Sequence, residues 1–290
     1  MPVAARTIKT TNGTQESHKK KKVVFILGAT GTGKTKLSID LATHYKAEII
    51  NSDKIQVYHG LDIVTNKATE AERKGIPHHL LGFLQDPEAD FTIRDFCIQV
   101  HRAINHIIND NGCTPIVVGG SNTYIKALVE DDESFKGEFD ACFLWMDVEL
   151  SVLYKRVSKR IDQMVDAGLV DEIRGFFAPG IDYSKGVWRA IGVPEMEKYF
   201  LAEKNMADET TKRILLDAAI QETKENTCKL VNSQIAKINM FRKKLGWKLH
   251  RLNATSVFEK AGIEADDAWK KMVLNPSLKI VGDFLGEPAY

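Results

Sequence analysis

The sequence predicts an α/β fold, with a parallel sheet flanked by helices and a smaller helical subdomain. Short apolar runs of β-forming residues recur along the first half of the chain, and segments with helical spacing alternate with them. Such alternation is typical of a parallel sheet covered on both faces. Beyond about residue 150 the pattern becomes mainly helical. A chain of 290 residues is long enough for one large domain of this kind.

The expected strands are short apolar runs, most of which end at Gly or at polar residues. They cover residues 23–27, 47–50, 115–118 and 142–146, and residues 247–252 are expected to return to the sheet as a last strand. The expected helices cover residues 35–45, 91–109, a segment through Tyr124 and Leu128, 151–177 and about 208–244. The second of these helices has one apolar face, formed by Phe96, Val100, Ile104 and Ile107.

These elements divide the chain into four expected segments. They are a basic polar leader (1–22), an α/β core (23–150), a mainly helical region that covers the substrate (151–246) and a C-terminal strand and helix that return to the core (247–290). The leader holds six basic residues against Glu16 alone, and it lacks the apolar stretch of a secretory signal. Transit-peptide remnants and solvated tails both have this composition. We expect a plastid protein, with a cytoplasmic one as the alternative.

The overall composition excludes several classes of protein. The formal net charge is +1, which does not indicate a highly basic nucleic-acid binder. No apolar run reaches the ~18 residues that a membrane-spanning helix needs. The four cysteines lie far apart without a Cys-x-x-Cys pair, which argues against a structural zinc site. Nothing in the sequence indicates oligomerisation, and we expect a monomer.

One short motif predicts a phosphate site. It has the pattern G-x-x-x-x-G-K-[ST] and consists of Gly28, Ala29, Thr30, Gly31, Thr32, Gly33, Lys34 and Thr35. Its glycines permit a tight turn whose N–H groups face phosphate oxygens, at the positive end of the helix that follows. Lys34 supplies a point charge, and the Thr35 hydroxyl can bind Mg²⁺. The motif makes the expected fold P-loop NTPase-like.

The motif alone leaves the nature of the phosphate open. Such a loop can hold the γ-phosphate of a nucleotide for phosphoryl transfer, as in kinases. It can equally hold a diphosphate that leaves while carbon is the electrophile. The other blocks of the sequence have to decide between these chemistries.

Several further blocks, in this order and spacing, resemble the isopentenyltransferase family, which contains tRNA dimethylallyltransferases and the adenylate isopentenyltransferases that make cytokinins. The resemblance spans about residues 22–244. Besides the phosphate loop, the blocks that carry it are residues 51–58 (NSDKIQVY), 60–67 (GLDIVTNK), 77–81 (PHHLL), 118–124 (VGGSNTY) and 189–192 (RAIG).

Within the family, the sequence is similar to the plant adenylate type. Ser121 and Asn122 follow the glycine pair where tRNA enzymes usually carry Thr-Gly-Leu-Tyr, and residues 188–195 (WRAIGVPE) and 225–230 (ENTCKL) have the plant form. Residues 232–234 (NSQ) stand where tRNA enzymes have Lys-Arg-Gln. The stretch between Gly120 and Arg189 is shorter than in tRNA enzymes, and there is no Cys/His set like the zinc finger of eukaryotic tRNA enzymes.

The resemblance implies transfer of a dimethylallyl group from dimethylallyl diphosphate to the N6 amine of an adenine nucleotide (ATP, ADP or AMP), with release of diphosphate. That amine is a poor nucleophile and needs a base to take its proton. Asp53, at the carboxyl end of the second expected strand, matches the general base of the family. A helix cap or a magnesium ligand is the alternative role for this carboxylate.

On the donor side, the resemblance implies that the phosphate loop, Lys34 and Mg²⁺ at Thr35 stabilise the charge that develops on the diphosphate. Thr30 matches a threonine that helps to position the amine or the base. Arg189 matches an arginine placed at the diphosphate, where its bidentate fork suits phosphate oxygens. A surface salt bridge is the alternative for Arg189.

The remaining candidates line or cover the expected site. Thr65 and Lys67 match residues close to the catalytic centre, where Thr65 is expected to orient Asp53 or the donor. A hydroxyl that satisfies a turn is the alternative role of Thr65. Ser121 and Asn122 are expected to shape the acceptor pocket. An acceptor ATP would need a second cationic zone. Arg156 and Arg160 lie four residues apart on one expected helix, as in a lid, and are candidates for it, with Arg160 expected to bind substrate; a solvated charged helix face is the alternative.

The rival functions differ in acceptor or in chemistry. A tRNA dimethylallyltransferase would modify adenosine next to the anticodon, but the short central stretch and low net charge argue against tRNA as a partner. A kinase of small metabolites would use the loop for ATP. A nucleotide-dependent binding module would not react at all. No membrane partner is expected.

Overall fold

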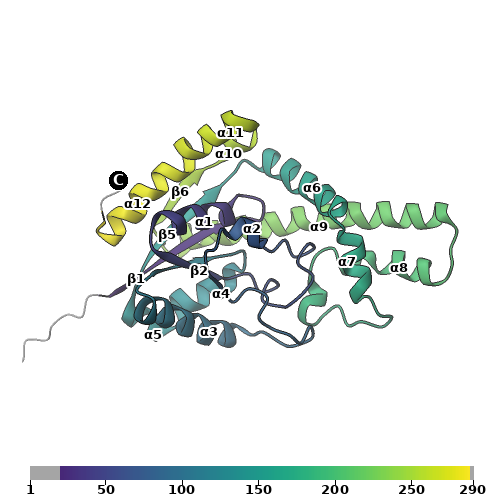
Figure 1. The fold of residues 1–290 in the computed structure, drawn as a ribbon, viewed down its shortest axis with the longest axis horizontal. Helices are drawn as coiled ribbons and strands as arrows, with labels where there is room; N and C mark the ends of the chain where they lie inside the picture. Colours follow the sequence, from purple (N-terminus) through teal and green to yellow (C-terminus); the bar gives the residue numbers. More distant parts are fainter. Residues whose placement is uncertain (1–19, 288–290) are drawn as a thin grey trace, which may run out of the picture.

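The computed structural model describes residues 20–287 and contains a six-stranded, all-parallel sheet in the order β3-β2-β4-β1-β5-β6 (Figure 1). This confirms the predicted fold class. The strands are β1 (Lys21–Gly28), β2 (Ala47–Asn51), β3 (His78–His79), β4 (Thr114–Val118), β5 (Phe139–Asp147) and β6 (Leu249–Asn253). Because β1 lies between β4 and β5, the loop that follows it opens at the middle of the sheet edge.

Strand β1 is buried on both faces, since Val23 to Leu27 have no exposed surface. Val23, Phe25 and Leu27 belong to one apolar core, and Val24 and Ile26 belong to a second core on the opposite face. Two covered faces explain why the strand is a continuous apolar run rather than an alternating one.

Different helices cover the two faces. The core around Val24 includes residues of α1 (Lys34–His44), α10 (Thr255–Phe258), α11 (Gly262–Trp269) and α12 (Asn275–Leu285). The core around Phe25 includes residues of α3 (Ile93–Asn105), α4 (Asn122–Lys126) and α5 (Glu133–Glu138), which lie on the other side of the sheet in Figure 1. The helix expected over 91–109 begins at Ile93 and continues as a π-helical segment, His106–Asp110. Similar segments, Ala127–Asp131 and Lys270–Leu274, extend α4 and α11.

The chain between β5 and β6 is mainly helical. It contains α6 (Leu150–Asp166), α7 (Leu169–Phe176), α8 (Glu197–Lys204) and the 36-residue α9 (Glu209–Lys244), with two short 3-10 turns, Gly186–Arg189 and Pro194–Met196. The buried residues of α9 form one stripe from Ala219 to Phe241. The stripe carries three polar side chains, Thr223, Thr227 and Gln234. Among the described residues, no helix is both long and apolar enough to cross a membrane.

Two expectations from the sequence were wrong in detail, and one strand was missed. The helix expected over 151–177 is two helices, because Gly168 adopts φ 101 and starts α7. His78 and His79, for which the sequence analysis predicted no strand, form an edge strand because they pair with Ile49 and Ile50 of β2. The leader was expected to reach residue 22, but Lys21 and Lys22 already pair with β5. Residues 1–19 lie outside the described residues.

A close backbone approach at Gly186 provides a test of the packing of the helical region. Gly186 has φ 44, and a Cβ atom there would lie 1.7 Å from the carbonyl oxygen of Pro87. We expect Gly186→Ala to lower the free energy of unfolding by about 1–3 kcal/mol, because both the dihedral angle and the contact become strained. Urea denaturation measures this change.

Gly175→Ala is the matched control. Gly175 is an exposed residue of α7 with no atom within 4 Å of the position of an added Cβ. Alanine there should stabilise the protein slightly, by up to ~1 kcal/mol, through its helix propensity. Equal effects of the two substitutions would contradict the packing described at Gly186.

Candidate active site

The phosphate-loop motif begins at Gly28, the last residue of β1, and ends in the first turn of α1. Gly31 and Gly33 have φ 83 and 91, values that favour glycine, and Gly33 is the N-cap of α1. A Cβ on Gly31 would lie 2.7 Å from a methyl carbon of Val157 in α6. A Cβ on Gly28 would lie 2.8 Å from the carbonyl oxygen of Met146. The glycines therefore permit both the turn and its close packing.

The carbonyl oxygen of Ala29 holds the loop closed. It accepts hydrogen bonds from Lys34 Nζ (2.8 Å) and from the hydroxyl of Thr32 (2.8 Å). Burial lowers the pKa of Lys34 to about 8, while the carboxylate of Asp53 acts to raise it and Arg160 to lower it. A half-buried ammonium group whose charged form is disfavoured by burial is well placed to receive an anion.

Asp53 follows the end of β2 and faces the same cleft. Its Oδ1 accepts the N–H of Ile55 at 3.0 Å, and its own N–H donates to Asn51 Oδ1 at 3.1 Å. These contacts form a turn that orients the carboxylate. Asp53 Oδ2 would lie 3.4 Å from a Cβ atom on Gly120. The structure brings together the predicted base and the predicted phosphate loop, since both line one cleft.

Two arginines of α6 reach the loop from above the sheet edge. Arg160 donates from Nη2 to the hydroxyl of Thr30 at 2.9 Å, and Arg156 donates from Nε to the carbonyl of Gly31 at 2.8 Å. Arg156 also stacks on the ring of Phe258, 3.9 Å from its centroid. Burial lowers the pKa of Arg160 to about 10, and its Nε has no partner among residues 20–287. Arg160 is therefore a second half-buried cation that faces the loop.

These groups share a cleft of about 1040 Å³. Its walls come from the phosphate loop (including Thr30, Lys34 and Thr35), the turns after β2 and β4, helix α6, and the C-terminal segment from Val257 to Trp269. The sequence did not indicate that the C-terminal segment would line the site. Trp269 packs within 3.1 Å of the position of a Cβ on Gly33, so this wall lies directly against the loop.

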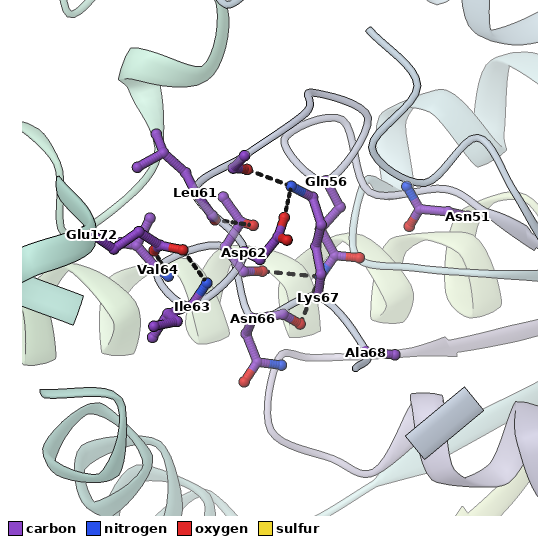
Figure 2. A network of polar contacts seen from close by, with 12 residues as sticks. Asn51, Gln56, Leu61, Asp62, Ile63, Val64, Asn66, Lys67, Ala68 and Glu172 are labelled. Carbon is purple, nitrogen blue, oxygen red and sulfur yellow. Dashed lines mark hydrogen bonds and ion pairs between the residues drawn. The ribbon is translucent and has the colours of Figure 1, made fainter. Parts of the chain in front are cut away.

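Thr65 and Lys67 do not line the cleft. The Thr65 hydroxyl donates to the carbonyl of Leu61 at 2.6 Å, and Lys67 Nζ is bound to Asp62 at 2.7 Å and to the carbonyl of Gly60. Figure 2 shows Lys67 turned toward Asp62. The neighbouring Asn66 does line the cleft. The side chains of Thr65 and Lys67 therefore stabilise the loop from Gly60 to Ala68 through contacts within that loop.

The same loop is held from outside by Gln56 and Glu172 (Figure 2). Gln56 lines the cleft and donates from Nε2 to the carbonyls of Thr65 and Asn66, both at 3.0 Å. The carboxylate of Glu172, in α7, accepts the N–H groups of Ile63 and Val64, both at 2.8 Å. The sequence analysis had assigned no role to Gln56 or Glu172.

Ser121 and Asn122 brace the site rather than line the cleft. The Ser121 hydroxyl accepts the N–H of Lys54 at 2.9 Å, and Asn122 Nδ2 donates to the carbonyl of Gln234 at 3.3 Å. Gly119 allows the turn to approach Ser52, because a Cβ there would lie 2.4 Å from the carbonyl carbon of Ser52. The expected pocket-shaping role of Ser121 and Asn122 is thus indirect in this structure.

Arg189 lies apart from the phosphate loop. Its Nε donates to the carbonyl of Gly186 at 3.2 Å, and it is not part of the cleft wall. Partial burial, and next the nearby positive charge of Arg189, lower the pKa of Lys54. Arg189 is thus near Lys54, the residue after Asp53. Its expected contact with a diphosphate stays a prediction.

Gln234 is the main polar residue that the sequence analysis missed. It lies on the buried stripe of α9, and only 6% of its surface is exposed. Its Oε1 accepts the N–H of Thr30 at 2.8 Å, and its Nε2 donates to the carbonyl of Gly120 at 3.1 Å. An amide in the middle of a helix pattern was a detectable signal, but its partners lie more than 100 residues away in the chain.

Comparisons with known proteins agree with these features. The family model described as "IPP transferase" matches residues 56–138 and 130–240. Adenylate isopentenyltransferase 5, chloroplastic, of Arabidopsis thaliana is 52% identical over 92% of this chain and 81% of its own length. Adenylate isopentenyltransferase 7, mitochondrial, of the same plant is 46% identical, again over 92% of this chain and 81% of its own length. A solved structure of a eukaryotic dimethylallyltransferase acting on tRNA has a TM-score of 0.75 at 25% identity, covering 93% of this chain and 81% of that one.

The depressed pKa of Lys34 leads to a prediction about anion binding. Lys34 loses its proton as the pH rises through about 8, so the affinity for inorganic diphosphate should fall above that pH. Lys34→Met should weaken this binding by roughly 10–100-fold, since a charge-assisted contact is lost. Calorimetric titration at several pH values checks both expectations, and the variant should lack the wild-type fall in affinity.

The same substitution should stabilise the ligand-free protein. The folded state disfavours the charged form of Lys34, so removing the ammonium group relieves a cost of about 1–3 kcal/mol at neutral pH. Thermal unfolding without diphosphate should therefore occur at a higher temperature in Lys34→Met. A lower unfolding temperature combined with unchanged diphosphate affinity would contradict the placement of this side chain.

Proposed function

Because the chain belongs to the IPP transferase family, we propose that it transfers a dimethylallyl group from dimethylallyl diphosphate to the N6 amine of an adenine nucleotide (ATP, ADP or AMP) in cytokinin synthesis. It is a prenyltransferase. The observation that carries the proposal is the single cleft that holds both the carboxylate of Asp53 and the phosphate loop with Lys34. The level of identity to adenylate isopentenyltransferases favours a free nucleotide over tRNA as acceptor.

The phosphate loop would bind the diphosphate of the donor. The N–H groups near the head of α1 and the cations Lys34 and Arg160 face one region, where negative charge develops as the allylic C–O bond breaks. These groups are fixed before the reaction, so little reorganisation is needed. The Nε of Arg160, which has no hydrogen-bond partner within the described part of the chain, is a donor available to a phosphate oxygen.

Asp53 would act as the general base. Its carboxylate takes a proton from the N6 amine while the nitrogen forms a bond to the allylic carbon, and diphosphate leaves with the electrons of the C–O bond. Asn51 and the N–H of Ile55 hold Asp53 in a fixed turn. Gln56 and Asn66 line the cleft near this position and can contact the acceptor ring. Arg189, whose positive charge acts on Lys54, would act on substrate phosphates.

Magnesium is the proposed cofactor, and the available ligands fit a site built mainly from substrate oxygens. Thr35 lines the cleft at the head of α1, while no cluster of three or more His, Cys, Asp or Glu that could hold a metal exists among residues 20–287. Mg²⁺ commonly binds through few protein ligands together with phosphates and water. When bound, the ion would neutralise charge on the diphosphate.

We further propose that the protein acts as a monomer in an organelle. The relatives labelled chloroplastic and mitochondrial favour organellar targeting, and the basic leader favours the plastid. Import of a fusion of the full chain to a fluorescent protein tests the localisation.

The function is tested by incubating the protein with dimethylallyl diphosphate and Mg²⁺ together with AMP, ADP, ATP or unmodified tRNA in parallel. We expect N6-modified free nucleotide by mass spectrometry and no modified tRNA. Asp53→Asn should lower kcat by about 10²–10⁴-fold, because the base is lost. Its affinity for inorganic diphosphate should change little.

Asp110→Asn is the matched control, since Asp110 is an exposed residue far along the chain at the end of the π-helical segment after α3. It should retain wild-type activity. Modification of tRNA alone would overturn the proposed acceptor. Formation of ADP from ATP without a prenylated product would assign the loop to a kinase.

A further inference from the structure

The phosphate loop and the base lie on different strands, so something must hold them at a fixed separation. The loop follows β1 and Asp53 follows β2, and β4 lies between these strands. The turn after β4, which contains Gly119 and Gly120, therefore separates the two halves of the site. Ser121 N–H donates to the carbonyl of Ser52 at 3.1 Å, which fixes that turn to the segment carrying Asp53.

Gln234 connects this turn to the phosphate loop. Its Oε1 accepts the N–H of Thr30, and its Nε2 donates to the carbonyl of Gly120. An N–H can only donate and a carbonyl can only accept, so these two partners determine the orientation of the amide. A Cβ on Gly120 would lie 2.5 Å from Gln234 Nε2 and 3.4 Å from Asp53 Oδ2. The amide of Gln234 and the carboxylate of Asp53 thus both border Gly120.

Both the backbone N–H and the hydroxyl of Thr30 are consequently hydrogen-bonded. Gln234 of α9 binds its backbone N–H, and Arg160 of α6 binds its hydroxyl. Since the N–H of Thr30 is engaged by Gln234, it serves to locate the loop rather than to bind phosphate in this structure. The backbone of Gln234 is itself held through the side chain of Asn122.

We propose that Gln234 is a positioning residue for the transfer reaction, setting the separation between the donor diphosphate in the phosphate loop and the carboxylate of Asp53. This role rests on the proposed function. Gln234 acts through Thr30 and Gly120 and does not itself exchange a proton or bind the leaving group. The geometry for in-line attack depends on that separation, and a misplacement of about 1 Å can cost on the order of 100-fold in rate.

The first test is Gln234→Met, which keeps the length of the side chain but removes both hydrogen bonds. We expect kcat to fall by about 100-fold, while KM for dimethylallyl diphosphate and the affinity for inorganic diphosphate change by less than about threefold. Lys34 and Arg160 still bind the anion, so the loss appears in the chemical step. An unchanged kcat would overturn the proposal, and so would an equal loss in diphosphate affinity.

Ile238→Val controls for loss of stability. Ile238 is a fully buried residue one turn further along the same stripe of α9. It should lower the unfolding temperature yet keep kcat within about twofold of wild type. If kcat of Ile238→Val and of Gln234→Met falls in proportion to lost stability alone, Gln234 has only a structural role.

The second test uses Gln234→Glu, whose side chain can replace the amide only when protonated. A protonated carboxyl can accept from Thr30 and donate to Gly120, whereas an ionised one repels the Gly120 carbonyl. Burial and Asp53 raise the pKa of such a group, while Lys34 and Arg160 lower it. The ratio of kcat for this variant to wild-type kcat should therefore rise as the pH falls.

Gln221→Glu is the chemical control, because Gln221 lies on the exposed side of α9. The ratio of kcat for this control variant to wild-type kcat should be independent of pH. If the ratio of kcat for Gln234→Glu to wild-type kcat does not depend on pH, the proposed role of the hydrogen bonds to Thr30 and Gly120 is overturned. If the wild type binds diphosphate but transfers no dimethylallyl group, the proposed function fails and this role fails with it. Full transfer by the Gln234 variants refutes the positioning role alone.

Discussion

Positive charge withdrawn from water at the end of the central strand is the constraint on which the site depends. Lys34 and Arg160 both have pKa values lowered by burial, and Asp53 is the carboxylate that acts to raise the pKa of Lys34. Withdrawing two cations from water is costly unless negative charge compensates them. A ligand with several phosphate oxygens supplies that charge. The folded protein therefore favours a bound anion at this position before any substrate chemistry begins.

The arrangement of the sheet explains why these charges meet. Parallel strands place all their carboxyl ends at one edge, and the order of strands in the sheet brings the turns after β1, β2 and β4 together there. The helical region then adds Arg160 from α6 and Gln234 from α9. The core is thus a platform for the loop and the base, and the helices of the second half determine how the two are held.

The predictable part of the molecule was the part encoded locally. The fold class and the phosphate loop could be read from apolar runs and a motif of eight residues, and the resemblance to a family singled out Asp53. Thr65 and Lys67 were harder, since their contacts with Leu61 and Asp62 depend on how one loop folds back on itself. Gln234 could not be assigned, because its hydrogen bonds join segments that only the folded sheet brings together.

The juxtaposition of Lys34 and Asp53 also suits the charge movement in the proposed reaction. As the C–O bond breaks, one unit of negative charge develops on the diphosphate, and as N6 loses its proton, Asp53 becomes neutral. The total charge of the cleft stays constant, because one negative charge moves from the carboxylate to the diphosphate held in the phosphate loop. Asp53 acts to raise the pKa of Lys34, and Lys34 can interact with the leaving group as that carboxylate is neutralised. Because the donors of the loop are already fixed, the transfer needs little rearrangement of surrounding dipoles, which is the condition for effective electrostatic stabilisation.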